Sequence, residues 1–297
     1  MTTATRRTFL VGASATAATL VSGRVWATPR KAGTARAGAP LRFGMSSPSA
    51  DWSKCLSDVQ AKSGKLQARR LFVSGFSSVP GFLRTAKSEW AAGRYPVLSL
   101  STTEWTKFAS GAYDPQIRTW ISQIKANNHP MSWALKHEPI GDGDPKAYAA
   151  MQAHVAPMFK QAGLSFGPIF NGFAWSSQGQ GMTEAEIAQW IPDSVIPQFD
   201  FVASDCYHGG TTAKPGEDAG PKMRGMSAWA TRKGVTKLGI GEFSGLTAPA
   251  LGNAYSALHA DGRYAWACVF NSSRNNRPGV DWTLTGDRLT SFQQQLA

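Results

Sequence analysis

The feature that most constrains the fold is a regular alternation of short apolar runs with longer segments of helical pattern. Eight runs of strand length, each bounded by turn residues, lie at 41–47, 68–76, 95–101, 131–138, 164–172, 199–208, 237–244 and 264–272. Eight segments with helical character lie at 49–63, 79–92, 116–127, 145–162, 183–191, 221–233, 249–260 and 286–296. Strict eightfold alternation over about 250 residues is typical of a (β/α)8 TIM barrel.

Signals at the segment ends support this pattern. Asp144 followed by Pro145 fits a helix N-cap and first helical position, and Thr183 and Glu186 have the spacing of a capping box. A doubly wound sheet is the alternative, but no glycine-rich phosphate turn follows the first strand. We therefore expect an α/β fold with a single (β/α)8 catalytic barrel over residues 41–297.

The first 27 residues have the pattern of an export signal. Two arginines precede an apolar, alanine-rich stretch that ends in VWA at 25–27, a plausible cleavage site. The run RRTFL at 6–10 resembles a twin-arginine signal, with a plain secretory signal as the alternative. We expect residues 1–27 to be a signal peptide and 28–40 a flexible leader. The mature protein would then be secreted, in the extracellular space or at the cell wall.

Charge and cysteine content limit the classes of binding partner and the expected state of the thiols. The net charge is +12, or +9 without the three arginines of residues 1–27, but the basic residues are scattered and form no nucleic-acid motif. We expect attraction to acidic polysaccharide, no nucleic acid, and no membrane span beyond the N-terminus. Cys55, Cys206 and Cys268 are odd in number and lack CxxC spacing. Cys206 and Cys268 lie in strand-like runs, which favours buried free thiols, with one disulfide as the alternative.

Two glutamates end predicted strands that are otherwise apolar. Glu138 closes the fourth strand, WALKHEP, and Glu242 closes the seventh, LGIGEFSG. Active sites of such barrels lie at the C-terminal strand ends, and strands four and seven can face each other across the mouth. Alternation puts Lys136 on the face of Glu138, and Leu238 and Ile240 on the face of Glu242. We expect both carboxylates to point into the mouth, unless a bulge changes the register.

Two opposed carboxylates are what glycoside hydrolysis needs. One carboxylic acid protonates the leaving oxygen, and in retaining enzymes a carboxylate about 5–5.5 Å away attacks the sugar carbon. Burial and like-charge repulsion raise one pKa and thereby separate the two roles. The pair predicts a glycoside hydrolase that needs no cofactor.

These motifs resemble those of the glycoside hydrolase clan A barrels. HEP at 137–139 stands where most of that clan has Asn-Glu-Pro, and His-Glu there resembles family 26, the β-mannanase family. IGEFSG at 240–245 is similar to the nucleophile segment of family 26, whereas PIGDGD at 139–144 departs from its pattern. The resemblance implies that Glu138 is the acid/base and Glu242 the nucleophile.

The same resemblance implies two supporting residues. His137 would hold the substrate or the nucleophile by a hydrogen bond. Tyr207, at the end of the sixth strand, would hydrogen-bond the nucleophile, with a packed tyrosine as the alternative. Asp205, two residues earlier on the same face, would be a further mouth residue or the buried partner of a basic side chain.

Three more residues are candidates for sugar binding. Trp175 follows the fifth strand and Trp105 follows the third, where flat aromatic rings can stack on sugar faces. Asn171 ends the fifth strand and is a candidate for binding a sugar hydroxyl.

Two other functions stay open. His137, Glu138, Asp205 and His208 could together form the site of a metal-dependent barrel hydrolase, although no His-x-His spacing occurs and the chain has only 5 histidines. A non-catalytic barrel that binds a glycan or the cell wall is the second alternative. The favoured hypothesis is a secreted, monomeric, retaining endo-β-glycanase that binds no metal and cleaves a poly- or oligosaccharide.

Overall fold

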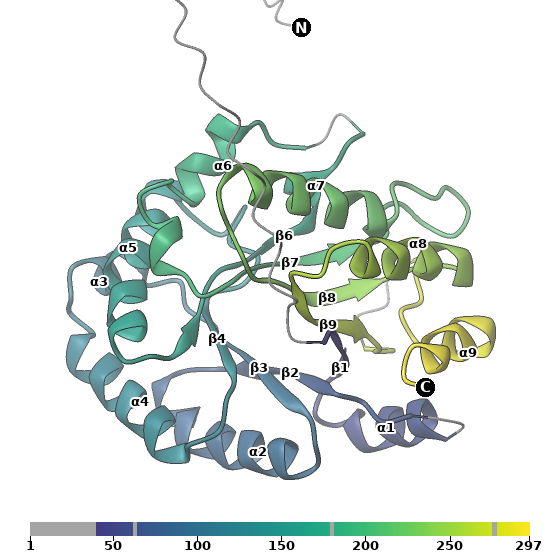
Figure 1. The fold of residues 1–297 in the computed structure, drawn as a ribbon, viewed down its shortest axis with the longest axis horizontal. Helices are drawn as coiled ribbons and strands as arrows, with labels where there is room; N and C mark the ends of the chain where they lie inside the picture. The colour runs from purple at the N-terminus through teal and green to yellow at the C-terminus, as the bar shows by residue number, and fades with distance from the viewer. Residues whose placement is uncertain (1–39, 62–63, 179–180, 275–277) are drawn as a thin grey trace, which may run out of the picture. The chain divides into compact units, whose positions relative to one another are not determined.

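Strands and helices alternate along the chain in the predicted order (Figure 1). The computed structural model describes residues 40–61, 64–178, 181–274 and 278–297. The predicted signal peptide, and the leader apart from Pro40, lie outside the described residues. The strands are β1 (Arg42–Ser46), β2 (Ala68–Val73), β3 (Tyr95–Leu100), β4 (Ser132–Leu135), β5 (Ser165–Phe166), β6 (Ile169–Asn171), β7 (Val202–Tyr207), β8 (Leu238–Ser244) and β9 (Tyr264–Phe270).

Each predicted helix is present, and α3 is an addition in the loop after β3. The α-helices are α1 (Trp52–Gln60), α2 (Val79–Ala91), α3 (Trp105–Ala109), α4 (Asp114–Asn127), α5 (Pro145–Gln161), α6 (Glu184–Trp190), α7 (Ala219–Arg232), α8 (Ala248–His259) and α9 (Gly286–Gln294). Short 3-10 helices are η1 (Phe76–Ser78), η2 (Gly172–Trp175) and η3 (Ile196–Gln198). Asp144 caps α5, and Thr183 and Glu186 form the predicted capping box of α6. No described helix is long and apolar enough to cross a bilayer.

The strands form one parallel sheet in the order β5-β4-β3-β2-β1-β9-β8-β7-β6. β5 and β6 are the two halves of the predicted fifth strand, interrupted at Gly167-Pro168; β5 pairs with β4, and β6 pairs with β7. A parallel bridge between His137 and Ile169 connects the β4 end to β6. Nine strand segments therefore occupy eight barrel positions, and the predicted (β/α)8 barrel is confirmed.

Side chains form one packed layer on each side of the sheet. The barrel interior contains small and aromatic residues from most strands, including Ala68, Val97, Ala134, Ile169, Ala203, Trp266 and Cys268. Trp266 fills much of this space, because a Cβ on Gly239 would lie 2.3 Å from its indole ring. The larger outer layer packs strands against helices. Cys206 and Cys268 are buried free thiols, as predicted, and Cys55 is also buried and free.

Candidate active site

Glu242 lies near the C-terminal end of β8, where the strand is irregular. Leu238 and Ile240 pack in the outer layer against the helices, so the prediction that they share the face of Glu242 is wrong. The register of β8 against both neighbouring strands shifts beside Gly241, which is the mark of a β-bulge. The bulge turns Glu242 toward the barrel mouth. A Cβ on Gly241 would lie 2.3 Å from Asp205 Oδ1, so this close approach requires glycine.

Two hydroxyl groups hold the buried carboxylate of Glu242. Ser46 Oγ, at the end of β1, donates to Glu242 Oε1, and the Tyr207 hydroxyl, at the end of β7, donates to Oε2. Burial raises the pKa of Glu242 above its ordinary value, although the charge of Arg70 and the two hydrogen bonds oppose this rise. Burial and the negative charge of Glu242 raise the pKa of Tyr207 well above its usual range, so the phenol keeps its proton. The two hydroxyl donors therefore fix the direction of the Glu242 carboxyl group and, with Arg70, favour its charged form against the effect of burial.

Arg70 is the cation of the site, and the sequence analysis did not single it out. It lies on β2, two residues after the interior residue Ala68, and its side chain is buried. None of its three guanidinium nitrogens hydrogen-bonds to another described residue. Its charge lowers the pKa of Glu138 and of Glu242. A buried arginine without hydrogen-bond partners keeps five N–H donors for a ligand. The signal in the sequence was a charged residue inside an apolar strand.

Glu138 is positioned by irregular backbone and not by a strand. β4 ends at Leu135, three residues before Glu138, so the prediction that Glu138 closes the strand by regular alternation is wrong. Lys136 has φ 56° and Glu138 has φ 47°, a region that side-chain-bearing residues rarely occupy. The Glu138 N–H donates to the Ile169 carbonyl at 2.9 Å, which ties the turn to β6.

The electrostatics of Glu138 differ from those of Glu242. Burial and repulsion by Glu242 raise the pKa of Glu138 to about 7, against the opposing charges of Arg70 and Lys136. Hydrogen bonds are not among the causes of this shift. Lys136 itself forms an ion pair with Asp142. A carboxyl group with a pKa near neutrality can both donate and accept a proton at working pH.

His137 and Asp205 lie beside Glu138. Burial and the charge of Arg70 lower the pKa of His137 to about 3, so its imidazole is neutral. Asp205 is buried, and a hydrogen bond from the Glu242 backbone N–H favours its charged form. Burial and repulsion by Glu242 raise its pKa well above the usual range, against the opposing charge of Arg70.

These three residues are also the candidates for a metal site. Ligand atoms of His137, Glu138 and Asp205 lie within 4.8 Å of one another, so they are the described group best able to hold a metal ion. The fixed charge of Arg70 acts on both carboxyls and opposes a divalent cation there. His208, the fourth predicted ligand, lies elsewhere, with its Nδ1 2.9 Å from Asp218 Oδ1.

Trp105 and Trp175, which were predicted to stack on sugars, are buried by packing contacts. Trp105 is 3% exposed and packs against Tyr148 and Trp190, so it offers no free face to a sugar. Trp175 is 5% exposed, and its indole N–H donates to Ser204 Oγ at 3.1 Å. Both rings belong to the outer layer, which contradicts their prediction as sugar platforms.

Asn171 is a buried support for the loop that follows Glu138. Its Oδ1 accepts a hydrogen bond from the Ile140 N–H at 2.9 Å. The amide therefore connects the end of β6 to the segment that carries the acid. The structure thus brings together Glu138, Glu242, His137, Tyr207 and Asp205, with Asn171 next to them.

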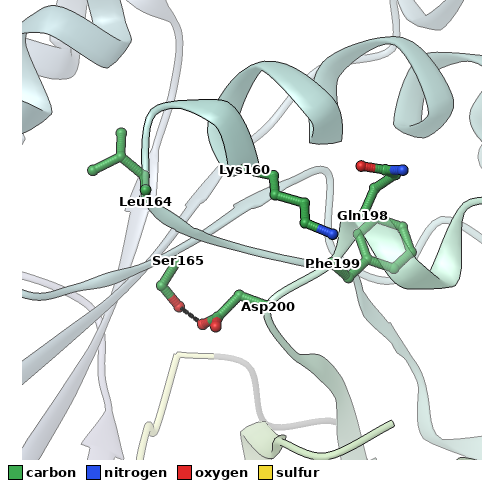
Figure 2. Close-up of a pocket in the computed structure, with 7 residues that line it drawn as sticks. Lys160, Leu164, Ser165, Gln198, Phe199 and Asp200 are labelled. Atoms are coloured by element: carbon green, nitrogen blue, oxygen red, sulfur yellow. Dashed lines mark hydrogen bonds between the residues drawn. The ribbon is translucent and has the colours of Figure 1, made fainter. Parts of the chain in front are cut away.

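A hollow at the opposite end of the strands provides a contrast. It has a volume of about 310 Å³ and lies where β5 and β7 begin; its lining residues are Lys160, Gly163, Leu164, Ser165, Gln198, Phe199 and Asp200 (Figure 2). Ser165 donates to Asp200, and Lys237 forms an ion pair with Asp200 at 2.7 Å. Its second charged residue, Lys160, donates to the Pro197 carbonyl oxygen, whereas the Arg70 guanidinium nitrogens in the mouth have no hydrogen-bond partner among the described residues.

Comparisons with known proteins agree with the barrel fold. No protein-family model matches the sequence, and no curated protein matches it significantly. The structure is similar to a modular endo-β-1,4-mannanase of glycoside hydrolase family 26 from Cellulomonas fimi, with TM-score 0.55 and 13% identity over 86% of this chain and 70% of that one. It is also similar to the catalytic domain of a mannanase from Streptomyces sp. SirexAA-E, with TM-score 0.53 and 17% identity over 90% of each chain.

A third similar structure comes from another family. It is a glycoside hydrolase family 30 subfamily 8 xylanase from Clostridium acetobutylicum, with TM-score 0.56 and 14% identity over 87% of this chain and 72% of that one. At these identities the likeness establishes the (β/α)8 fold. Chemical arguments about this chain must come from its own residues.

Proposed function

We propose that this chain is a retaining endo-β-glycanase in which Glu138 is the acid/base and Glu242 the nucleophile. The observation that carries the proposal is the contrast between two neighbouring carboxyl groups. Glu242 is held by two hydroxyl donors beside a cation, whereas the pKa of Glu138 is raised to about 7. A nucleophile and a proton donor need these two different environments.

The first step transfers the sugar to the protein. Protonated Glu138 donates its proton to the glycosidic oxygen while a carboxylate oxygen of Glu242 attacks the anomeric carbon. The bond to the leaving sugar breaks, and a glycosyl ester forms on Glu242. Loss of negative charge on Glu242 removes the repulsion that helped to keep Glu138 protonated, so Glu138 can remain an anion.

The second step returns the enzyme to its starting state. Anionic Glu138 takes a proton from water, and the resulting hydroxide attacks the anomeric carbon. The ester bond breaks, Glu242 is released as a carboxylate, and the product has the configuration of the original linkage. Two inversions at one carbon give net retention.

Neighbouring side chains support these steps. Ser46 and Tyr207 orient Glu242, and Arg70 stabilises its charge before attack and on departure. Neutral His137 is suited to hydrogen-bond a sugar hydroxyl, because its Nδ1 has no partner among the described residues. Asp205 completes the buried polar cluster beneath them.

We further propose that the substrate is a β-linked polysaccharide and that the protein is exported. Similar structures are named as mannanase, xylanase and β-1,4-galactanase. The His-Glu motif favours a mannan, and the basic balance suits an acidic glycan environment. The signal-like residues 1–27 support secretion after twin-arginine export.

A polysaccharide screen tests the proposal. The wild type and the Glu138→Ala and Glu242→Ala variants are incubated with soluble β-1,4-mannan, β-1,4-xylan and β-1,4-galactan, and new reducing ends are counted. We expect one glycan to be cleaved and both variants to lose about 10³-fold or more of the rate. Glu184→Ala, an exposed change on α6, is the matched control and should keep full activity. Wild-type rates in both active-site variants would refute the mechanism.

Chelation separates this proposal from the metal-dependent alternative. The group of His137, Glu138 and Asp205 is the observation that favours a metal. We expect activity to be unchanged after dialysis against EDTA. Loss of activity that returns when Zn²⁺ or Mn²⁺ is added would favour the metal site instead.

A further inference from the structure

Two exposed phenylalanines lie on the rim of the barrel mouth. Phe72 is 38% exposed and Phe173 is 42% exposed, and they are the two large hydrophobic side chains exposed in the described part of the chain. A single exposed apolar residue is ordinary on a protein surface. These two are informative because both lie at C-terminal strand ends, on the same rim as the candidate carboxyl groups.

Phe72 lies on the inward face of β2. Ala68 is part of the barrel interior, and alternation places Arg70 and Phe72 on the same face, progressively closer to the mouth. The Phe72 ring lies 4.6 Å from the Arg70 guanidinium carbon and 5.1 Å from the His137 ring. Phe72 is therefore an apolar surface directly beside the polar groups of the site.

Phe173 lies in η2, immediately after β6. Gly172 precedes it at a tight approach, because a Cβ on Gly172 would lie 2.3 Å from the Asp205 carbonyl oxygen. Trp175, two residues later, is buried and anchors the segment. The backbone on both sides of Phe173 is thus held against β7 and the outer layer, while its ring stays in solvent.

The order of the strands, which Figure 1 labels, places β2 and β6 on opposite sides of the line from β4 to β8. One path around the barrel from β4 to β8 passes β3, β2, β1 and β9, and it contains Phe72. The other path passes β5, β6 and β7, and it contains Phe173. A line across the mouth from Phe72 to Phe173 therefore crosses the line from Glu138 to Glu242.

We propose that Phe72 and Phe173 are sugar-stacking platforms on the two sides of the bond that is cleaved. Aromatic rings stack on the apolar faces of sugars, and exposed rings can do so without rearrangement. A glycan bound to both would place an internal linkage between the carboxyl groups, which deepens the proposed function by explaining endo action. The inference rests on that function for the position of the cleaved bond.

Kinetics of Phe72→Ala and Phe173→Ala test the platforms. The substrates are whichever of β-1,4-mannan, β-1,4-xylan and β-1,4-galactan the wild type cleaves, and the β-fluoride of the matching disaccharide. The fluoride fills only the sites on one side of the cleaved bond. We expect each variant to lower kcat/KM for the polysaccharide about tenfold, mainly through KM. One variant alone should lower kcat/KM for the fluoride.

Phe199→Ala is the matched control, since Phe199 lines the hollow at the opposite end of the strands (Figure 2). It should leave both rates unchanged. Unchanged polysaccharide rates in both rim variants, or equal losses on the fluoride, would overturn the inference.

A binding measurement keeps the inference separate from the proposed function. If the wild type cleaves none of the three glycans, native gels containing the same glycans decide the matter. Retardation of the wild type that Phe72→Ala and Phe173→Ala both lose would support the platforms although the proposed hydrolysis had failed. Absent retardation, or retardation that both variants keep, would refute them.

Discussion

The two rim carboxyl groups reach the barrel mouth in different ways. Glu242 lies inside β8 at a bulge, and hydroxyl groups from β1 and β7 hold both of its oxygens. Glu138 lies three residues beyond β4 on backbone with positive φ, and its pKa is set by burial and neighbouring charges. Burial raises the pKa of both carboxyl groups, but hydrogen bonds oppose the rise at Glu242 alone, whereas the pKa of Glu138 reaches about 7.

The difference shows which surroundings each proposed catalytic role requires. A nucleophile must keep its charge and direction, so donors from two other strands surround Glu242. A general acid must exchange a proton with substrate and water, so a pKa near neutrality is more useful than a strong partner. Lys136 and Asp142, which pair with each other, adjust the charge near Glu138 in opposite directions.

Replacing each carboxyl group should produce the largest difference. Glu242→Ala removes the attacking atom, so we expect about 10⁴-fold loss on every substrate. Glu138→Ala should lose about 10³-fold on polysaccharide but much less on a substrate with an activated leaving group, which needs no proton. Steady-state rates on dinitrophenyl and natural glycosides measure this. Equal rates on both substrate types in Glu138→Ala would contradict the assignment.

Removing one hydrogen bond to Glu242 should have the next largest effect on the catalytic rate. Tyr207→Phe removes the donor to Oε2, and we expect kcat to fall about 10–100-fold while KM changes little. Tyr95→Phe is the matched control, because the Tyr95 hydroxyl contacts Ser132 near the start of β4. Comparable losses in the two variants would indicate a structural effect and not a catalytic one.

The pH profile should separate the acid from the nucleophile. Glu138 must be protonated to act, so kcat/KM should fall as pH rises through about 7. Lys136→Met removes a charge that lowers this pKa and should move the limb upward, whereas Asp142→Asn should move it downward. Initial rates between pH 4 and 9 give the midpoints. If the two variants shifted the midpoint in the same direction, the ionisation of Glu138 would not explain the fall in kcat/KM.

Stability should show the smallest effect. Because the folded pKa of Glu138 is about 7, above its ordinary 4.5, its contribution is fully present below about pH 4.5 and is lost as pH rises through 7. Glu138→Gln should therefore raise the free energy of unfolding by about 1–3 kcal/mol at pH 8, and Tm by several degrees, but not at pH 4.

Glu242→Gln is the comparison for that measurement. It removes a negative charge that Arg70 and two hydrogen bonds stabilise, so we expect a smaller gain at pH 8 than for Glu138→Gln. Thermal unfolding followed by circular dichroism at both pH values gives the answer. An equal gain in both variants would mean that the two environments do not differ as described.

Much of the fold could be predicted from the sequence, because apolar periodicity reports burial directly. All eight strand positions and eight helices lie where the pattern places them, and Glu138 and Glu242 both reach the rim. The way in which Glu242 reaches the mouth could not be predicted, since a bulge at Gly241 reverses the alternation of β8. Only the packing of Asp205 against Gly241 reveals why glycine is needed there.

Side-chain surroundings were harder to predict than strand positions. Trp105 and Trp175 follow strands in loop-like sequence, yet both fold back into the outer layer. Ser46 lies in an ordinary strand pattern and Arg70 is a charged residue inside an apolar strand, but the roles of both depend on partners far along the chain. Long-range contacts of this kind leave no periodic trace in one sequence.

The configuration of the first-formed product tests the central claim most directly. Proton NMR can follow the anomeric signals while the wild type cleaves the best substrate of the screen, before mutarotation mixes them. Two carboxyl groups acting as acid/base and nucleophile predict that the β configuration appears first. First appearance of the α anomer would mean direct attack by water and would contradict the role of Glu242.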